Sequence, residues 1–189
     1  MTDSPARGGK RARLVASALD LLYRQGVART TLADVAEAAD VPIGNVYYYF
    51  KTKDALVEAV IDAHADSLRA MFASFERHHD PRARLRAFIR SRAETGEYLA
   101  RYGCPHGSLC QELGKRADGL GRACASLLAL YVDWSAEQFQ LMGADDARDL
   151  ATALIAGVEG AALLANTFRD PELMARQVHQ LERWLDSLP

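Results

Sequence analysis

Long apolar runs are missing from this sequence. No segment approaches the roughly eighteen uninterrupted apolar residues of a membrane-spanning helix, and the opening MTDSPARGGKR lacks the apolar stretch of a signal peptide. Cysteine is scarce too, and an odd total of three argues for reduced thiols instead of a disulfide framework. These absences predict a cytoplasmic protein with no membrane partner.

Proline and net charge are also low. Only six prolines interrupt a chain of 189 residues with helical apolar spacing almost throughout, so we predict an all-α fold. The net charge of −2 conceals an asymmetry, since residues 1–53 carry eight Lys/Arg and five Asp/Glu, whereas residues 54–189 carry fifteen and twenty. The net positive charge of residues 1–53 suits a small domain that binds a polyanion, and the net negative charge of residues 54–189 suits a larger domain that does not.

Residues 31–53, TLADVAEAADVPIGNVYYYFKTK, contain two short helical patterns separated by a turn. Thr31 is a good N-cap residue and Asp34 follows three positions later, so the first helix begins at a near capping box. Pro42 disfavours helical geometry at the residue before it, which ends the first helix. A second helix fits over residues 43–50.

The second helix has one apolar side and one unusual side. At about 100° per residue, Ile43, Val46 and Phe50 share the apolar side. The opposite side carries a glycine, an amide and two tyrosines, which suit a DNA groove better than open solvent; these residues are Gly44, Asn45, Tyr48 and Tyr49. Glycine permits close approach, the amide can pair with a base edge, and tyrosines and lysines can bond phosphates. The pattern predicts a helix-turn-helix whose second helix enters the major groove.

This block resembles the DNA-binding domain of the TetR family of repressors. Asp40 stands where the family usually has glycine, and aspartate tolerates the left-handed backbone of such a turn. Pro42 stands where the family usually has serine, which removes one cap and one phosphate contact. The matching residues are Thr31, Asp34, Val35, Ala36, Ala39, Val41, Gly44, Val46, Tyr47, Phe50, Lys53 and Leu56. The candidate DNA-binding residues are Thr31, Pro42, Gly44, Asn45, Tyr47, Tyr48, Tyr49, Lys51 and Lys53.

We place the domain boundary after residue 53. A helix-turn-helix DNA-binding domain over 1–53 would then precede a larger ligand-binding and dimerisation domain over 54–189. Helices are expected over residues 9–25, 54–79, 81–102, a short stretch ending near 114, 119–142, 145–168 and 171–188.

The segment GCPHGSLCQEL, residues 103–113, resembles a G-C-x-x-G-x-L-x-x-E-L motif in the regulatory domains of some TetR-like proteins. Cys104 precedes a proline suited to the first helical position, so amide donors and the positive dipole end favour a reactive thiolate. The alternative, which we prefer, is a small buried residue that fills a tight corner. A zinc site of Cys104, His106 and Cys110 lacks an evident fourth ligand, and we expect no metal or cofactor.

Aromatic and apolar residues of the second domain are the candidates for an effector site, because a helical bundle can open a cavity between facing helices. Tyr131 and Trp134 share a helix face and carry polar tips that can orient a mostly apolar ligand. His64 either bonds a ligand or satisfies a buried carbonyl. The candidate ligand-binding residues are His64, Phe72, Phe88, Tyr98, Cys104, Leu109, Tyr131 and Trp134.

The last two predicted helices suggest a self-association surface. The helix predicted over residues 145–168 carries a strip of small residues, Ala156, Gly157, Gly160 and Ala161, which includes two glycines. A glycine inside a helix costs about 1 kcal/mol unless close packing compensates. In TetR-like dimers the corresponding two helices of each chain pair in a four-helix interface, and the resemblance implies the same interface here. The alternative is that both helices only cover the core of their own domain. The candidate interface residues are Ala156, Gly157, Gly160, Ala161, Val178, Leu181, Trp184 and Leu185.

Two groups of basic residues leave alternatives open. Arg7, Lys10, Arg11 and Arg13 form either an arm for the DNA backbone or a solubilising tail. The arginine run over residues 82–92 is either a solvated helix face, which we favour, or a second nucleic-acid site.

The sequence therefore predicts a homodimeric transcriptional regulator, most often a repressor in this family. It would bind a near-palindromic operator in double-stranded DNA and be released by a small, largely apolar effector. No set of nucleophile, base and orienting residue stands out, so we do not expect an enzyme. The alternatives are a redox or electrophile sensor that acts through Cys104 and an architectural DNA binder without an effector.

Overall fold

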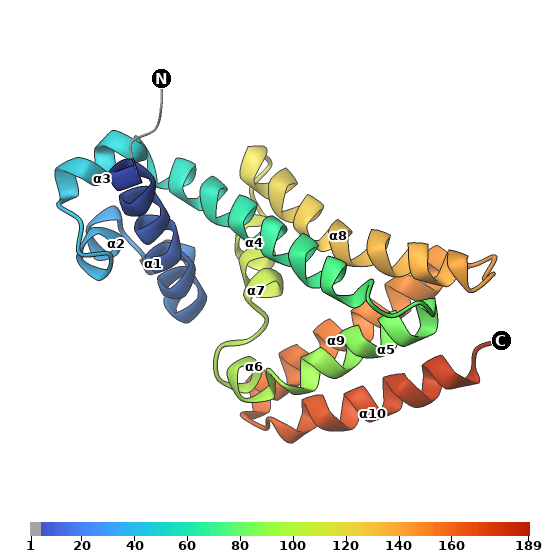
Figure 1. Ribbon diagram of the computed structural model, residues 1–189. Coiled ribbons are helices and arrows are strands. Elements are labelled where there is room, and N and C mark those ends of the chain that lie inside the picture. The colour runs from blue at the N-terminus through green and yellow to red at the C-terminus, as the bar shows by residue number, and fades with distance from the viewer. Residues whose placement is uncertain (1–4) are drawn as a thin grey trace. The chain divides into compact units, whose positions relative to one another are not determined.

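The computed structural model describes residues 5–189, with side chains from Gly9 onward, and every regular element in that part of the chain is a helix (Figure 1). The predicted all-α fold is confirmed. Arg7 of the predicted basic arm lies outside the described side chains. The helices are α1 (Pro5–Arg29), α2 (Leu32–Ala38), α3 (Ile43–Tyr49), α4 (Lys53–Phe75), α5 (Pro81–Ala93), α6 (Gly96–Tyr102), α7 (Pro105–Leu113), α8 (Gly119–Leu141), α9 (Ala147–Phe168) and α10 (Glu172–Ser187).

The chain divides into two compact units. The N-terminal unit holds the described residues up to Asp66 together with Ser108–Ser126, and the C-terminal unit holds Ser67–Gly107 and Leu127–Pro189. This division differs from the boundary expected after residue 53. The reason is that α7 and the start of α8 bury apolar side chains in the core of the N-terminal unit, namely Leu109, Leu113, Leu120 and Cys124.

Helix α1 supplies one side of the N-terminal core. Leu14, Ala18 and Leu22 recur at helical spacing and are buried. The regular helix is interrupted at Gly26, whose φ of 82° and ψ of 166° are accessible mainly to glycine. The regular helix therefore ends where the helix predicted over residues 9–25 ends, although a further turn continues to Arg29.

One helix predicted over residues 81–102 is in fact two, α5 and α6. The side chain of Thr95 donates to the carbonyl of Arg92 at 3.1 Å, a local bond that competes with helix continuation. Gly96 then begins α6 in a tight place, because a Cβ there would lie 3.2 Å from the Pro171 carbonyl oxygen. The break thus lets the chain pass close to the residues that precede α10.

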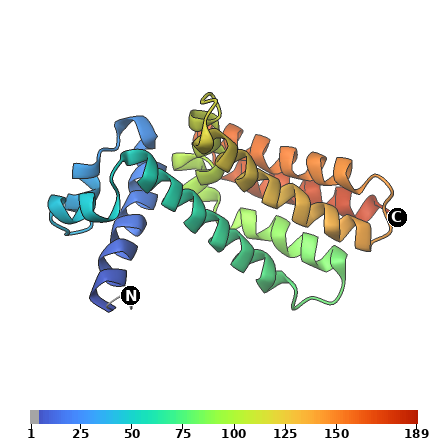
Figure 2. The same cartoon turned by 90° about the horizontal axis from the view of Figure 1, so that it is seen from above.

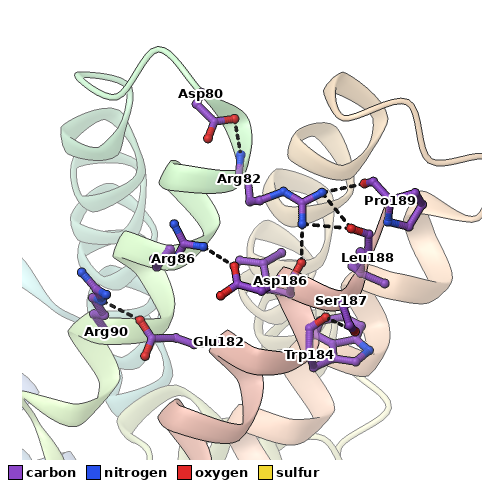
Figure 3. A network of polar contacts seen from close by, with 11 residues as sticks. Asp80, Arg82, Arg86, Arg90, Glu182, Trp184, Asp186, Ser187, Leu188 and Pro189 are labelled. Carbon is purple, nitrogen blue, oxygen red and sulfur yellow. Dashed lines mark hydrogen bonds and ion pairs between the residues drawn. The ribbon is translucent and has the colours of Figure 1, made fainter.

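The arginine run of α5 contacts α10 within the C-terminal unit (Figure 3). It therefore acts as a helix-to-helix contact, and the second nucleic-acid site considered from the sequence finds no support in this geometry. The solvated-face interpretation is also incomplete, since Arg82 and Arg86 are half-buried and, like exposed Arg90, have partners on or just after α10. Arg82 donates to the carbonyl oxygens of Leu185, Leu188 and Pro189, Arg86 pairs with Asp186, and Arg90 pairs with Glu182 at 2.6 Å.

Helix α9 lies beside α10 in both views of the C-terminal unit and packs on α6 as well (Figures 1 and 2). Among the described helices it alone is long and apolar enough to cross a membrane by length and composition. A core helix of a soluble bundle is also long and apolar. The buried residues of α9, such as Leu154 and Val158, fit a helix that packs on α6 and α10.

Candidate functional site

Helix α2 begins at a complete capping box. The Thr31 hydroxyl accepts a hydrogen bond from the Asp34 amide at 3.1 Å, and the Asp34 carboxylate accepts one from the Thr31 amide at 2.8 Å. The Thr31 backbone hydrogen bond is the main reason why the pKa of Asp34 is lowered. The predicted start of the first helix is confirmed, and Thr31 is already engaged in capping.

The turn between α2 and α3 depends on Asp40. Its φ of 49° is left-handed, as expected for a residue at the position where the family usually has glycine. The Val41 amide donates to the Ala36 carbonyl at 3.0 Å and closes the turn. The guanidinium of Arg13 in α1 donates to the Asp40 carbonyl, which ties the turn to α1.

Arg13 and its neighbours correct the prediction of a basic arm. Lys10, Arg11 and Arg13 belong to α1 itself and do not precede the first helix. Arg11 lies over the ring of Phe50, 5.3 Å from its centroid, and so covers the end of α3. Arg11 and Arg13, which were candidates for contacts with the DNA backbone, therefore make contacts within the N-terminal unit instead.

Helix α3 buries Val46 and is followed by buried Phe50, both as predicted. Ile43 was predicted on the same apolar side but is 45% exposed. It occupies the first position of a short helix, where the chain enters after exposed Pro42, and this position lies beyond the edge of the core. The outer surface of α3 is therefore larger than the sequence pattern indicated.

This outer surface gathers four of the nine predicted DNA-binding residues. Tyr47 and Tyr48 are 51% and 56% exposed, and nothing lies within 4 Å of the place where a Gly44 Cβ would stand. Asn45 is half-buried on the same short helix. Tyr49 was expected on this side but is half-buried against the core, because the exposed side of the helix includes Tyr47 instead. Tyr49 meets Tyr48 edge to face, with ring centroids 5.1 Å apart.

The two lysines differ. Lys51 is exposed, whereas the Lys53 ammonium donates to the Ala28 carbonyl at 3.4 Å and Lys53 begins α4. Both remain candidates for phosphate contact, and Lys51 has the more accessible charge.

Four predicted ligand-binding residues form one aromatic cluster in the C-terminal unit. Phe72 stacks on Trp134 with centroids 4.6 Å apart, and Tyr131 meets Phe72 edge to face at 5.6 Å. Phe88 lies 5.9 Å from both Tyr131 and Trp134. The sequence grouping of these four residues therefore corresponds to a spatial cluster contributed by α4, α5 and α8.

Three other predicted ligand-binding residues are not part of that cluster. His64 and Leu109 belong to the N-terminal unit, and Leu109 is buried in its core. Burial lowers the pKa of His64 to about 4, which suits a neutral core histidine. Tyr98 is 65% exposed on α6. Helical spacing alone does not indicate which unit a residue joins, so these three assignments were not resolvable from the sequence.

Cys104 is the N-cap of α7. Its sulfur accepts a hydrogen bond from the Gly107 amide at 3.3 Å and donates one to the Glu159 carboxylate at 3.2 Å. Burial, with the nearby charge of Glu159, raises the pKa of Cys104 to about 12. The proposed thiolate is therefore opposed by desolvation and by a carboxylate, and the preferred interpretation as a buried corner residue agrees with this geometry.

Cys104 adjoins a buried polar cluster that sequence analysis missed in large part. The Tyr131 hydroxyl and His106 Nδ1 are hydrogen-bonded at 2.9 Å. Glu159 enters from α9, and Arg92 enters from α5 with its guanidinium 5.5 Å from the Phe88 centroid. Glu159 lies among the small residues of α9 and Arg92 lies in the arginine run of α5, so the sequence pattern gave no sign that either side chain joins a polar cluster. Among the described residues no group of three or more His, Cys, Asp or Glu could hold a metal ion.

The predicted dimer residues divide into two sets. A Cβ on Gly160 would meet nothing within 4 Å, and Ala156 is exposed on the same helix. A Cβ on Gly157 would lie 3.2 Å from Leu181 of the same chain, so this glycine serves α9–α10 packing. Trp184 is half-buried and meets Phe139 at 6.0 Å, and the remaining residues, Ala161, Val178, Leu181 and Leu185, are buried within the chain. Sequence analysis missed the exposed apolar residues Leu163, Leu164 and Phe168.

A capped helix, a tight turn and a short helix with an exposed tyrosine surface define a helix-turn-helix DNA-binding protein, here with a helical C-terminal unit. Comparison with known proteins gives the family. Residues 14–60 match the family model described as bacterial regulatory proteins, tetR family, and residues 81–180 match the C-terminal domain of LmrA/YxaF-like transcriptional regulators. The chain belongs to the TetR family of transcriptional regulators, which are not enzymes.

Two curated relatives and two solved structures each match more than four fifths of this chain. TtgR of Pseudomonas putida is 27% identical over 94% of this chain and 88% of that protein, and AcuR of Cereibacter sphaeroides is 31% identical over 84% and 77%. A TetR regulator from Chloroflexus aurantiacus has a TM-score of 0.87 at 22% identity, covering 97% and 98% of the two chains. The regulatory protein TetR from Rhodobacter sphaeroides has a TM-score of 0.79 at 28% identity, covering 91% and 96%.

Proposed function

We propose that this regulator is a cytoplasmic, homodimeric repressor that a small, largely apolar effector releases from a near-palindromic operator. The exposed surface of α3 carries the proposal, because it presents Asn45, Tyr47 and Tyr48 beside exposed Lys51. In a dimer, two copies of α3 would enter successive major grooves about 34 to 36 Å apart.

The dimer would form through the outer face of α9. Ala156, Gly160 and Leu163 recur at helical spacing and are accessible in a single chain, and the open space at Gly160 suits close approach by a partner helix. Exposed apolar residues on one face of an apolar helix favour an interface over permanent solvation.

The effector would bind at the aromatic cluster of Phe72, Phe88, Tyr131 and Trp134, beside the polar groups around Tyr131. Rings supply apolar contact, and a few converging polar groups supply orientation. An effector that favours one conformation of the dimer by 1 to 3 kcal/mol, typical of allosteric coupling, would change operator affinity about 5- to 150-fold.

Footprinting on the DNA that flanks the gene of this protein, with and without a panel of small molecules, tests the proposal. Protection of a near-palindromic site that is lost with one compound supports it. Protection that no compound changes would favour the architectural DNA binder, and absence of protection would contradict a repressor acting at this DNA.

A further inference from the structure

We propose that the C-terminal unit binds a small organic carboxylate, whose anionic group is received by Arg92, Tyr131 and His106 while its apolar part packs on the aromatic cluster. The inference gives the chemical class of the effector site put forward above and rests on that site being used.

Arg92 is the first observation. Its guanidinium lies over the ring of Phe88, and its hydrogen bonds go to uncharged groups: the sulfur of Met71 at 3.5 Å, the hydroxyl of neighbouring Ser91 at 3.3 Å and the hydroxyl of Tyr131. It has no ion pair in the described part of the chain, whereas Arg86 and Arg90 of the same helix are both paired with carboxylates. The Glu159 carboxylate lies near enough to feel the charge of Arg92 but forms no ion pair with it, and a half-buried guanidinium in this state is suited to an anionic ligand.

Tyr131 is the second observation. Its hydroxyl bonds His106 at 2.9 Å, and it is hydrogen-bonded and electrostatically coupled to Arg92. Burial raises the pKa of Tyr131, so the hydroxyl keeps its proton and can serve as a donor. A guanidinium therefore lies beside a hydrogen-bonded phenol and imidazole at the edge of an aromatic surface. With a neutral imidazole the Tyr131–His106 pair uses one of its two protons for its own hydrogen bond, so the pair contributes one donor and Arg92 contributes the others toward a carboxylate.

Glu159 decides between an anionic and a cationic ligand. Its half-buried carboxylate accepts the Cys104 thiol and lies close enough to influence Tyr131, so it opposes an anion, just as Arg92 opposes a cation. The two obstacles differ in chemistry. Burial raises the pKa of Glu159, and a carboxylate can take up a proton, whereas arginine does not lose its charge in proteins.

The site can therefore adapt to an anion by protonating Glu159, but it cannot adapt to a cation. Binding of a carboxylate would take up a proton, and affinity would rise as pH falls. The groups that interact with Glu159 are Cys104, just before α7, Tyr131 from α8 and Arg92 from α5, and His106 of α7 is linked to it through its hydrogen bond with Tyr131. Among these, His106 is also ionisable, so its contribution must be separated by experiment.

The probes are benzoate, benzamide and benzylamine, which share one ring and carry negative, zero and positive charge. Calorimetry on the full chain should give benzoate an affinity at least about ten-fold above benzamide, with benzylamine weaker still. The same order is expected for propionate, propionamide and propylamine. Preference for either amine, or no saturable binding of either carboxylate at millimolar concentration, would overturn the proposal.

Variants test which side chain binds the carboxylate and which one causes the pH dependence. Arg92→Gln should weaken benzoate about ten-fold or more, whereas Arg90→Gln, which breaks an exposed pair with α10 on the same helix, should leave benzoate binding unchanged. Glu159→Gln should tighten benzoate at neutral pH and remove the pH dependence. If the dependence persists in Glu159→Gln and disappears in His106→Gln, the role given to Glu159 is wrong.

Operator binding keeps the two proposals apart, because calorimetry contains no DNA. Carboxylates that bind without releasing the operator would leave this site intact and contradict its regulatory use. Operator release by an uncharged or cationic compound, together with no carboxylate binding, would contradict this inference and leave the ligand-responsive repressor standing.

Discussion

Glu112 accepts a hydrogen bond from the backbone amide of Val27 at 2.8 Å, just beyond the glycine that interrupts α1. Its second oxygen accepts the Ala28 amide at 2.6 Å. A Cβ on Gly26 would lie 3.0 Å from the carboxylate, so the bare backbone permits this approach. Within the N-terminal unit, Glu112 thus satisfies two amides that the interrupted helix leaves without helical partners.

Replacing Glu112 with alanine should lower the free energy of unfolding by about 1 kcal/mol, since hydrogen bonds to a charged but partly exposed acceptor contribute modestly. Chemical denaturation measures the change. Gln111→Ala, at an exposed neighbouring position on α7, is the control and should differ little from the parent protein. Equal stability of the two variants would mean that the carboxylate does not support the end of α1.

Glu112 also illustrates what sequence can and cannot predict. Capping chemistry at Thr31 is local and was predicted from neighbouring residues, and the helix predicted over residues 9–25 ends at the special backbone of Gly26. The left-handed turn at Asp40 was expected from the resemblance to the family. The partner of Glu112 lies 85 positions away, and no periodicity identifies such a pair. The same limit explains why Arg92 and Glu159 were missed, since only tertiary packing brings them to Tyr131.

Asn45→Ala should weaken operator binding by about 1 to 3 kcal/mol if the amide contacts a base edge. Lys51→Ala should weaken binding to all DNA alike and make the salt dependence shallower by about one unit, because one phosphate contact is lost. Fluorescence anisotropy with operator and scrambled DNA at several salt concentrations measures both effects. Parent-like binding by both variants would remove α3 from the DNA interface.

The two glycines of α9 give a matched pair for the dimer. Gly160→Leu places its side chain in open space of the single chain, so folding should be retained while association is blocked. Gly157→Leu meets Leu181 and Gln177 within the chain, and overpacking of this kind costs about 1 to 3 kcal/mol of stability. Sedimentation velocity and thermal unfolding separate the outcomes. A stable Gly160→Leu dimer would contradict the interface.

His64 should make stability depend on pH. Its folded pKa of about 4 lies below the ordinary value of 6.5, so the neutral form is favoured in the folded state. The stabilisation is complete above pH 6.5 and is lost as pH falls toward 4, a linkage worth at most a few kcal/mol. His64→Gln should flatten the unfolding free energy over this window, whereas His179→Gln, on an exposed position, should retain the slope.

Cys104 should be the slow thiol at neutral pH, because burial and the Glu159 carboxylate keep it protonated. Half-buried Cys110 should react with iodoacetamide first, as peptide mass spectrometry would show. Cys104→Ser should fold and bind operator normally, since a serine hydroxyl can accept the Gly107 amide and donate to Glu159 as the thiol does. Fast labelling of Cys104 that also releases DNA would instead establish the electrophile sensor.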